Sequence, residues 1–317
     1  MQFALPPRKS SQPPIYSRPA SSGIRRRQLK SCGIVTCIAI SILYFIFHIL
    51  SSDATDTSAA HGPPVVVVTM LDEEQFSDPY IQKIKQNRED YVKRHGYVNF
   101  FASTVEYLPA IKGAPRSWAL IPAMRHALSL YPGSTYFFHL SPHAVIMDPS
   151  VSLASHVLDR SRLDSLMIKD VPVVPPDSVI KTFNHIGAKD VDLIISQDLE
   201  NLSPGSFILR RGEWAKFFLD AWFDPLYRSY NFAKSEVHAL DHIVQWHPTI
   251  LAKLALIPQR IINSYSSEVP NPGENGRYKD GDFIIRVAGC ETTAERNCEK
   301  EMEPYFQKWA NKQMQNK

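Results

Sequence analysis

The run Val65-Val66-Val67-Val68-Thr69-Met70 constrains the fold of this chain more than any other segment. β-Branched residues in unbroken succession, without alternating polar positions, are typical of a β-strand that is covered on both faces. A helical pattern follows, opened by Asp78-Pro79 and ended by Gly96. A buried strand followed by a helix indicates a parallel sheet with helices on its faces, so we expect an α/β domain.

The rest of the chain continues this alternation. We expect helices at 78–93, 118–130, 151–168, 213–222 and 236–245, and further strands at 99–102, 136–140, 193–195 and 206–209. Prolines between residues 171 and 190 predict a loop. One domain is therefore predicted over residues 65–306, with residues 307–317 as a C-terminal tail.

An apolar segment precedes this domain. Residues 31–50 contain no Asp, Glu, Lys or Arg, and their number is close to the roughly 20 residues with which a helix crosses a bilayer. Residues 1–30 carry seven Lys or Arg and no acidic residue, whereas Asp53 and Asp56 follow the span. This asymmetry places the N-terminus in the cytosol and the domain across the membrane.

We accordingly expect a type II membrane protein with a disordered basic tail (1–30), a transmembrane signal-anchor (31–50) and a stem (51–64). A cleaved signal peptide is the alternative, but its apolar core is usually only ~7–15 residues long. The net charge of +3 comes largely from the tail, so it does not indicate a nucleic-acid partner.

Two cysteines, Cys290 and Cys298, lie in the part predicted to face the lumen. An oxidising compartment permits disulfides, and the short separation suits a small closed loop. A disulfide is favoured, with two free thiols as the alternative.

Five segments, in the same order along the chain, resemble glycosyltransferase family 34, the galactosyl- and mannosyltransferases of fungi and plants. They are VVVVTMLD (65–72), NREDYVKRHGY (87–97), YPGSTYFFHLSPHAVIMDPS (131–150), QDLENLSPGSFILRRGEWAKFFLDAW (197–222), and IPQRIINSY (257–265) with YKDGDFIIRVAGC (278–290). Within the family the chain is most similar to the α-1,6-mannosyltransferase subunits of the mannan polymerase II complex.

The resemblance implies a GT-A-like glycosyltransferase domain and transfer with retention from an α-linked sugar nucleotide. It further implies GDP-mannose as donor, the mannan backbone of N-glycans as acceptor, other mannosyltransferase subunits as partners, and the Golgi membrane as location. Galactosyl transfer is an alternative, because the family includes both activities. Mn²⁺ is the usual cofactor of the family.

The chain departs from the family where the metal ion would bind. The family's Asp-x-Asp motif corresponds here to Ser141-Pro142-His143, and its late histidine to Arg286. Hard cations prefer carboxylate oxygens, so the usual Mn²⁺ ligands are largely absent. Three alternatives follow: weak metal binding by His143, a metal-independent site in which Arg286 faces the diphosphate, and a non-catalytic structural or acceptor-binding subunit.

The other candidate site residues come from the same alignment. Asp198 is the candidate catalytic carboxylate, which would stabilise positive charge on the reacting sugar; capping of a turn is its alternative role. Predicted donor-binding residues are Thr69, Asp72, Ser141, His143 and Arg286. Predicted pocket residues on the acceptor side are Gln197, Gly205 and Ser206.

Overall fold

The computed structural model describes residues 64–230, 232–270, 275–293 and 295–315, together with residues 41, 62 and 272. Its contacts separate residues 1–59 from residues 60–317. The predicted tail, all of the signal-anchor except residue 41, and most of the stem lie outside the described residues. Among the described residues, no helix is long and apolar enough to span a membrane.

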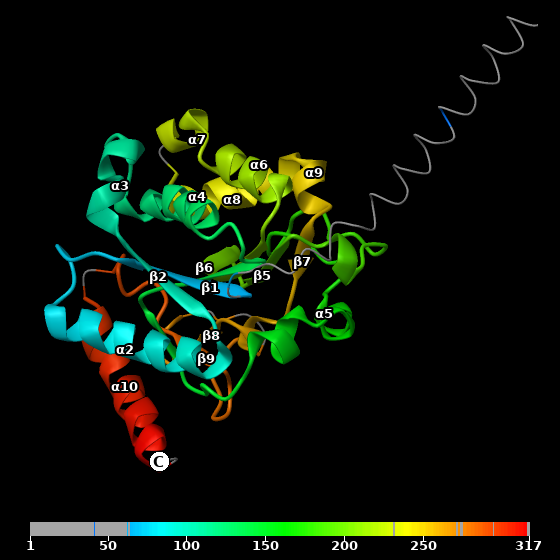
Figure 1. The fold of residues 1–317 in the computed structure, drawn as a ribbon. Helices are drawn as coiled ribbons and strands as arrows, with labels where there is room; N and C mark the ends of the chain where they lie inside the picture. The colour runs from blue at the N-terminus through cyan, green and yellow to red at the C-terminus, as the bar shows by residue number, and fades with distance from the viewer. Residues whose placement is uncertain are drawn as a thin grey trace, which may run out of the picture. The chain divides into compact units, whose positions relative to one another are not determined.

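A six-stranded sheet forms the centre of the domain (Figure 1). Its strand order is β2-β1-β3-β6-β5-β7; β1 pairs in parallel with both neighbours, and β6 runs antiparallel between β3 and β5. Every residue of β1 is buried, which confirms the strand covered on both faces. The strands are β1 (Val65–Leu71), β2 (Val98–Ser103), β3 (Tyr136–Leu140), β5 (Leu193–Gln197), β6 (Leu202–Arg210) and β7 (Leu254–Leu256).

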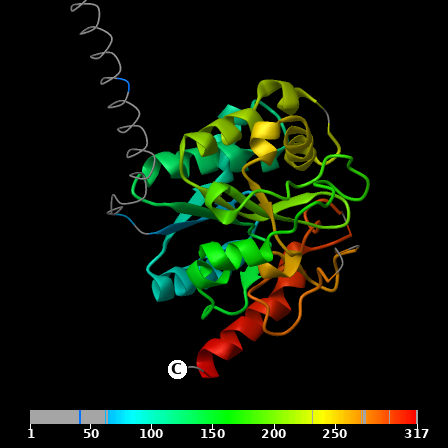
Figure 2. The ribbon, with the colours of Figure 1, turned by 90° about the vertical axis from the view of Figure 1, so that its right-hand side faces the viewer.

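Helices cover one face of this sheet (Figures 1 and 2). Val66 and Val68 of β1 point into this layer, where the core includes the fully buried Trp118 and Trp222. The helices of this face are α3 (Thr104–Ile111), α4 (Leu120–Leu130), α6 (Glu213–Trp222), α7 (Pro225–Ser229), α8 (Ser235–Trp246) and α9 (Pro248–Leu251).

The opposite face carries α2, α5, α10 and a second, three-stranded sheet ordered β4-β9-β8 (Figure 1). Val65 and Val67 point into this layer, so successive valines of β1 serve two separate cores. The elements here are α2 (Asp78–His95), α5 (Arg160–Leu166), α10 (Cys298–Gln315), β4 (Ala144–Ile146), β8 (Ser264–Tyr265) and β9 (Ile284–Arg286). The mixed α/β class expected from the sequence is confirmed.

Most predicted elements are present, and two boundaries differ. The expected helix at 151–168 is divided at Asp159, whose carboxylate accepts from the Arg162 N–H at 2.9 Å and starts α5 anew. At the other end, α10 continues to residue 315 and buries Trp309 in the core. The domain therefore extends beyond residue 306.

Candidate functional site

A pocket of about 330 Å³ opens beyond the carboxyl ends of β1 and β3. Ligands of open α/β sheets bind at this edge, because neighbouring chain connections diverge there. The pocket lining brings together five residues predicted from the sequence, which come from four separate segments: Asp72, Ser141, His143, Gly205 and Arg286.

The Ser141–His143 loop is held from below by a buried arginine. Arg88 of α2 is fully buried, and its Nη2 donates to the carbonyls of Ser141 (3.1 Å) and Ala144 (2.7 Å). Burial lowers the pKa of Arg88 to about 9, which still leaves the guanidinium charged at neutral pH. The loop thus has a fixed backbone and a positive charge beneath it.

The His143 ring is fixed by Tyr80. The Tyr80 hydroxyl lies 3.2 Å from the Pro142 carbonyl and 3.2 Å from His143 Nδ1. A carbonyl can only accept, so the phenol proton goes to Pro142, and His143 Nδ1–H donates to the phenol oxygen. Burial lowers the pKa of His143, which keeps the ring neutral with its lone pair on Nε2.

These residues do not fit the Mn²⁺ site that the resemblance implies. Among the described residues, the ligand atoms of four side chains lie within 4.8 Å of one another: His143, Cys290, Glu291 and Cys298. The two sulfurs are bonded to each other and cannot act as thiolate ligands. One imidazole and one carboxylate remain, close to the Arg286 charge, whereas a hard cation needs several carboxylate oxygens.

Arg286 is the cation that the pocket does contain. It lies on β9, and its Nη1 donates to Ser203 Oγ at 3.1 Å. A Cβ atom built on Gly205 would fall 1.9 Å from Cζ of Arg286, so the guanidinium rests directly on the Gly205 backbone. In the described part of the chain Arg286 has no carboxylate partner, and its Nε has no hydrogen-bond partner. Its charge is therefore available to a ligand.

Asp72 enters the pocket as half of an ion pair. Both of its carboxylate oxygens accept from Arg116 at 2.7 Å, and Oδ1 also accepts from the Glu74 N–H. Arg116 reaches Glu74 as well, at 2.9 Å. The aspartate therefore caps its loop and also positions a pocket arginine.

Two glutamates of the pocket were not predicted as site residues. Glu236 of α8 accepts a hydrogen bond from Ser117 Oγ, and burial raises the pKa of its carboxyl to about 7. On sequence alone it resembles ordinary helix polarity. Glu291 lies in the loop closed by the cysteines and also lines the pocket; no local sequence signal marks it or Arg116.

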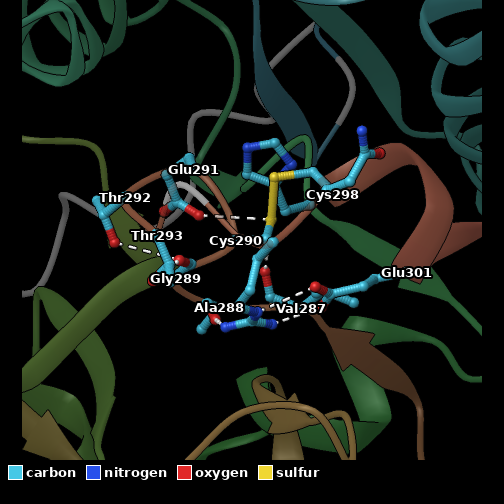
Figure 3. The surroundings of a disulfide bond; sticks show 12 residues. Val287, Ala288, Gly289, Cys290, Glu291, Thr292, Thr293, Cys298 and Glu301 are labelled. Atoms are coloured by element: carbon cyan, nitrogen blue, oxygen red, sulfur yellow. Dashed lines mark hydrogen bonds and ion pairs between the residues drawn. A yellow bond between two sulfur atoms is a disulfide. The ribbon is translucent and has the colours of Figure 1, made fainter.

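The loop between Cys290 and Cys298 contributes Glu291 and Thr292 to the pocket lining. Figure 3 shows the disulfide that closes this loop. Cys290 and Cys298, for which the sequence left two states open, are joined with an S–S distance of 2.11 Å. Arg296 braces the loop by donating to the Ala288 carbonyl at 2.8 Å and pairing with Glu301. Glu291 is thereby held on a short, doubly anchored segment.

Four predicted residues do not line the pocket. Thr69 and Ser206 are buried within β1 and β6, and the Gln197 amide faces the carbonyls of residues 172 and 173. Asp198 is likewise absent from the pocket lining. Its Oδ1 accepts from the N–H groups of residues 200 and 201, and its Oδ2 accepts from the Tyr265 hydroxyl at 2.9 Å.

Known proteins resemble this chain over most of the domain. An uncharacterized alpha-1,2-galactosyltransferase of Schizosaccharomyces pombe is 34% identical over 217 residues, which are 67% of this chain and 57% of that protein. A second one from the same organism is 29% identical and covers 89% of this chain and 92% of its own length. The probable alpha-1,6-mannosyltransferase MNN11 of Saccharomyces cerevisiae is 31% identical and covers 78% of this chain and 62% of its own length.

The chain thus spans little more than half of one relative and nearly all of another. A crystal structure of a glycosyltransferase involved in the glycosylation of the major capsid of PBCV-1 covers 76% of this chain, with a TM-score of 0.47 and 12% identity. The sequence pattern of the galactosyl transferase GMA12/MNN10 family matches residues 61–298. The assignment to glycosyltransferase family 34 is confirmed, and the chain belongs to this galactosyl transferase GMA12/MNN10 family.

Proposed function

We propose that the domain binds a sugar nucleotide in this pocket and holds its diphosphate with Arg286 instead of a metal ion. The observation that carries the proposal is the position of the Arg286 guanidinium against Gly205. This guanidinium lacks a carboxylate partner among the described residues. A guanidinium matches phosphate oxygens in a bidentate way and keeps its charge at any physiological pH. It can therefore stabilise the charge that develops on the departing diphosphate.

In the proposed transfer, the bond between the anomeric carbon and the diphosphate oxygen breaks, and a bond to an acceptor hydroxyl forms on the same face. The acceptor proton leaves with the diphosphate. Arg286 neutralises the negative charge of that leaving group throughout, so no metal ion takes part. The domain in this proposal is a GT-A-type enzyme that acts with retention.

For the substrates, we propose mannosyl transfer from GDP-mannose to the α-1,6-mannan backbone of N-glycans, within a complex of mannosyltransferase subunits at the Golgi membrane. The relative named as a probable alpha-1,6-mannosyltransferase supports this choice. Galactosyl transfer is the second candidate, because six other relatives carry alpha-1,2-galactosyltransferase in their names.

A non-catalytic subunit is the remaining candidate, favoured by the Ser-Pro-His sequence in place of the metal motif. The test is donor binding and transfer by the full chain, with GDP-mannose and UDP-galactose, in Mn²⁺ and in EDTA. We expect binding and transfer that survive EDTA. Arg286→Ala should weaken donor binding strongly and abolish transfer, whereas Arg211→Ala, which removes the same charge from an exposed position outside the pocket, should change neither.

Each outcome separates the candidates. The donor that is transferred decides between mannose and galactose. Activity lost in EDTA and restored by Mn²⁺ would refute the role of Arg286. Failure to bind either donor at millimolar concentration would refute both catalytic proposals, and activity that requires an added partner would support the subunit alternative.

A further inference from the structure

A line of hydrogen bonds runs from Arg286 away from the pocket to a carboxylate. Arg286 Nη1 lies 3.1 Å from Ser203 Oγ, which lies 2.7 Å from the Tyr265 hydroxyl. That hydroxyl lies 2.9 Å from Asp198 Oδ2. Ser203 and Tyr265 are buried, so the bond between their hydroxyls is shielded from water.

The direction of every bond in this line is determined by its neighbours. Ser203 Oγ accepts from two groups that can only donate, Arg286 Nη1 and Asn263 Nδ2, the latter at 2.7 Å. The serine proton must then go to the Tyr265 oxygen. The Tyr265 proton in turn goes to Asp198, since a carboxylate can only accept.

We infer that Ser203, Tyr265 and Asp198 position Arg286 through this line of hydrogen bonds. The line connects the guanidinium to the negative charge of Asp198. It leaves the N–H groups of Arg286 that face the ligand free to bind it. The inference rests on the proposed role of Arg286 in holding the diphosphate. A direct salt bridge would neutralise the guanidinium and occupy two of its N–H groups. The relayed contact takes one, at Nη1.

Two further contacts support this assignment. The Arg286 guanidinium lies over the Tyr265 ring, 5.8 Å from its centre, so the tyrosine supports the side chain through its face as well as its hydroxyl. Tyr265 and Arg286 are also register partners in the small sheet. The backbone of the two strands therefore fixes the spacing on which the line depends.

The line also accounts for Asp198 without placing it at the reacting carbon. One carboxylate oxygen caps the turn before β6, and the other ends the line. Asp198 is thus a positioning residue rather than a catalytic one. In the same way, Tyr265 is assigned a role that no sequence pattern indicated.

The test is Tyr265→Phe, which keeps the ring beneath Arg286 and removes only the hydroxyl. Calorimetric titration with GDP-mannose should show donor binding weakened roughly tenfold, about the effect of one buried hydrogen bond. Tyr278→Phe is the matched control: it also removes a buried hydroxyl, one without a hydrogen-bond partner in the described chain. This control should bind the donor as the unchanged protein does.

The double variant Tyr265→Phe, Arg286→Ala separates positioning from general destabilisation. If the hydroxyl acts through Arg286, its removal costs nothing further once the guanidinium is gone. The inference would be overturned if Tyr265→Phe weakened donor binding equally in the unchanged protein and in Arg286→Ala. It would also be overturned if Tyr265→Phe alone left donor binding unchanged. Unchanged binding in Arg286→Ala alone would instead overturn the proposed role of Arg286, so the two failures are distinguishable.

Discussion

Replacing Gly205 by alanine should weaken donor binding strongly while leaving the fold intact. The new Cβ would fall 1.9 Å from Cζ, 2.2 Å from Nη1 and 2.3 Å from Nε of Arg286, and ordinary contact begins at 3.4 Å. The guanidinium must therefore withdraw by about 1.5 Å, which is the difference between 3.4 and 1.9 Å. That distance separates a good hydrogen bond to phosphate from none.

The expected loss follows from the contacts that are broken. A hydrogen bond to a charged group contributes about 1.5–3 kcal/mol, so the loss of one or two contacts weakens donor binding by roughly 100-fold. The unfolding free energy should change by less than about 1 kcal/mol, because the displaced group is the end of a flexible side chain. Gly205 also lies in β6, outside the left-handed region, so its backbone suits alanine.

Calorimetric titration with GDP-mannose and urea unfolding measure the two quantities. Gly212→Ala is the control, because a Cβ there meets nothing within 4 Å. In an Arg286→Ala background the added methyl has room, and Gly205→Ala should then have no effect on binding. Normal donor affinity in Gly205→Ala, or the same loss without Arg286, would refute the reasoning.

Three other changes test separate parts of the structure. Burial raises the pKa of Glu236 to about 7, from 4.5, so the native state holds this proton more tightly and loses stability as pH rises from 4.5 to 7. Glu236→Gln removes that loss: in urea unfolding it should be about 3 kcal/mol more stable than the unchanged protein at pH 8 and nearly equal at pH 4.5; parallel curves would contradict this. Arg88→Met leaves the carbonyls of Ser141 and Ala144 without this donor. It should lower the unfolding free energy by about 3 kcal/mol and weaken donor binding. An unchanged urea midpoint would refute the role of Arg88 in holding the loop. Cys290→Ser removes the disulfide between two cysteines that lie eight positions apart. It should lower the unfolding free energy by about 2.5 kcal/mol, as measured by thermal unfolding. Equal melting temperatures with and without the disulfide would show that other contacts hold the loop.

The sequence predicted the fold well because its evidence was local. The valine run of β1, the aromatic run of β3 and the Gly96 helix end each indicate their structure within a few residues. The family segments then indicated the candidate site residues, and five of these residues line one pocket.

The rest of the site depended on contacts between distant residues, which local patterns do not contain. Arg88 is a charged residue in a helix and resembles a surface position, yet it is fully buried. Glu236 is also a charged residue in a helix and resembles a solvated position, yet it lines the pocket. Asp198 combines the local signature of a turn cap with that of a functional carboxylate, and only the Tyr265 hydroxyl, 67 positions away, reveals its second contact.

Helix α10 should make the domain sensitive to truncation at this helix. α10 packs against β4, whose first residue Ala144 follows directly on the Ser141–His143 loop. Trp309, close to the C-terminus, shares a core with Leu71 at the end of β1. A stop codon at position 307 would remove Trp309 from that core. Truncation before Trp309 should therefore cause loss of function.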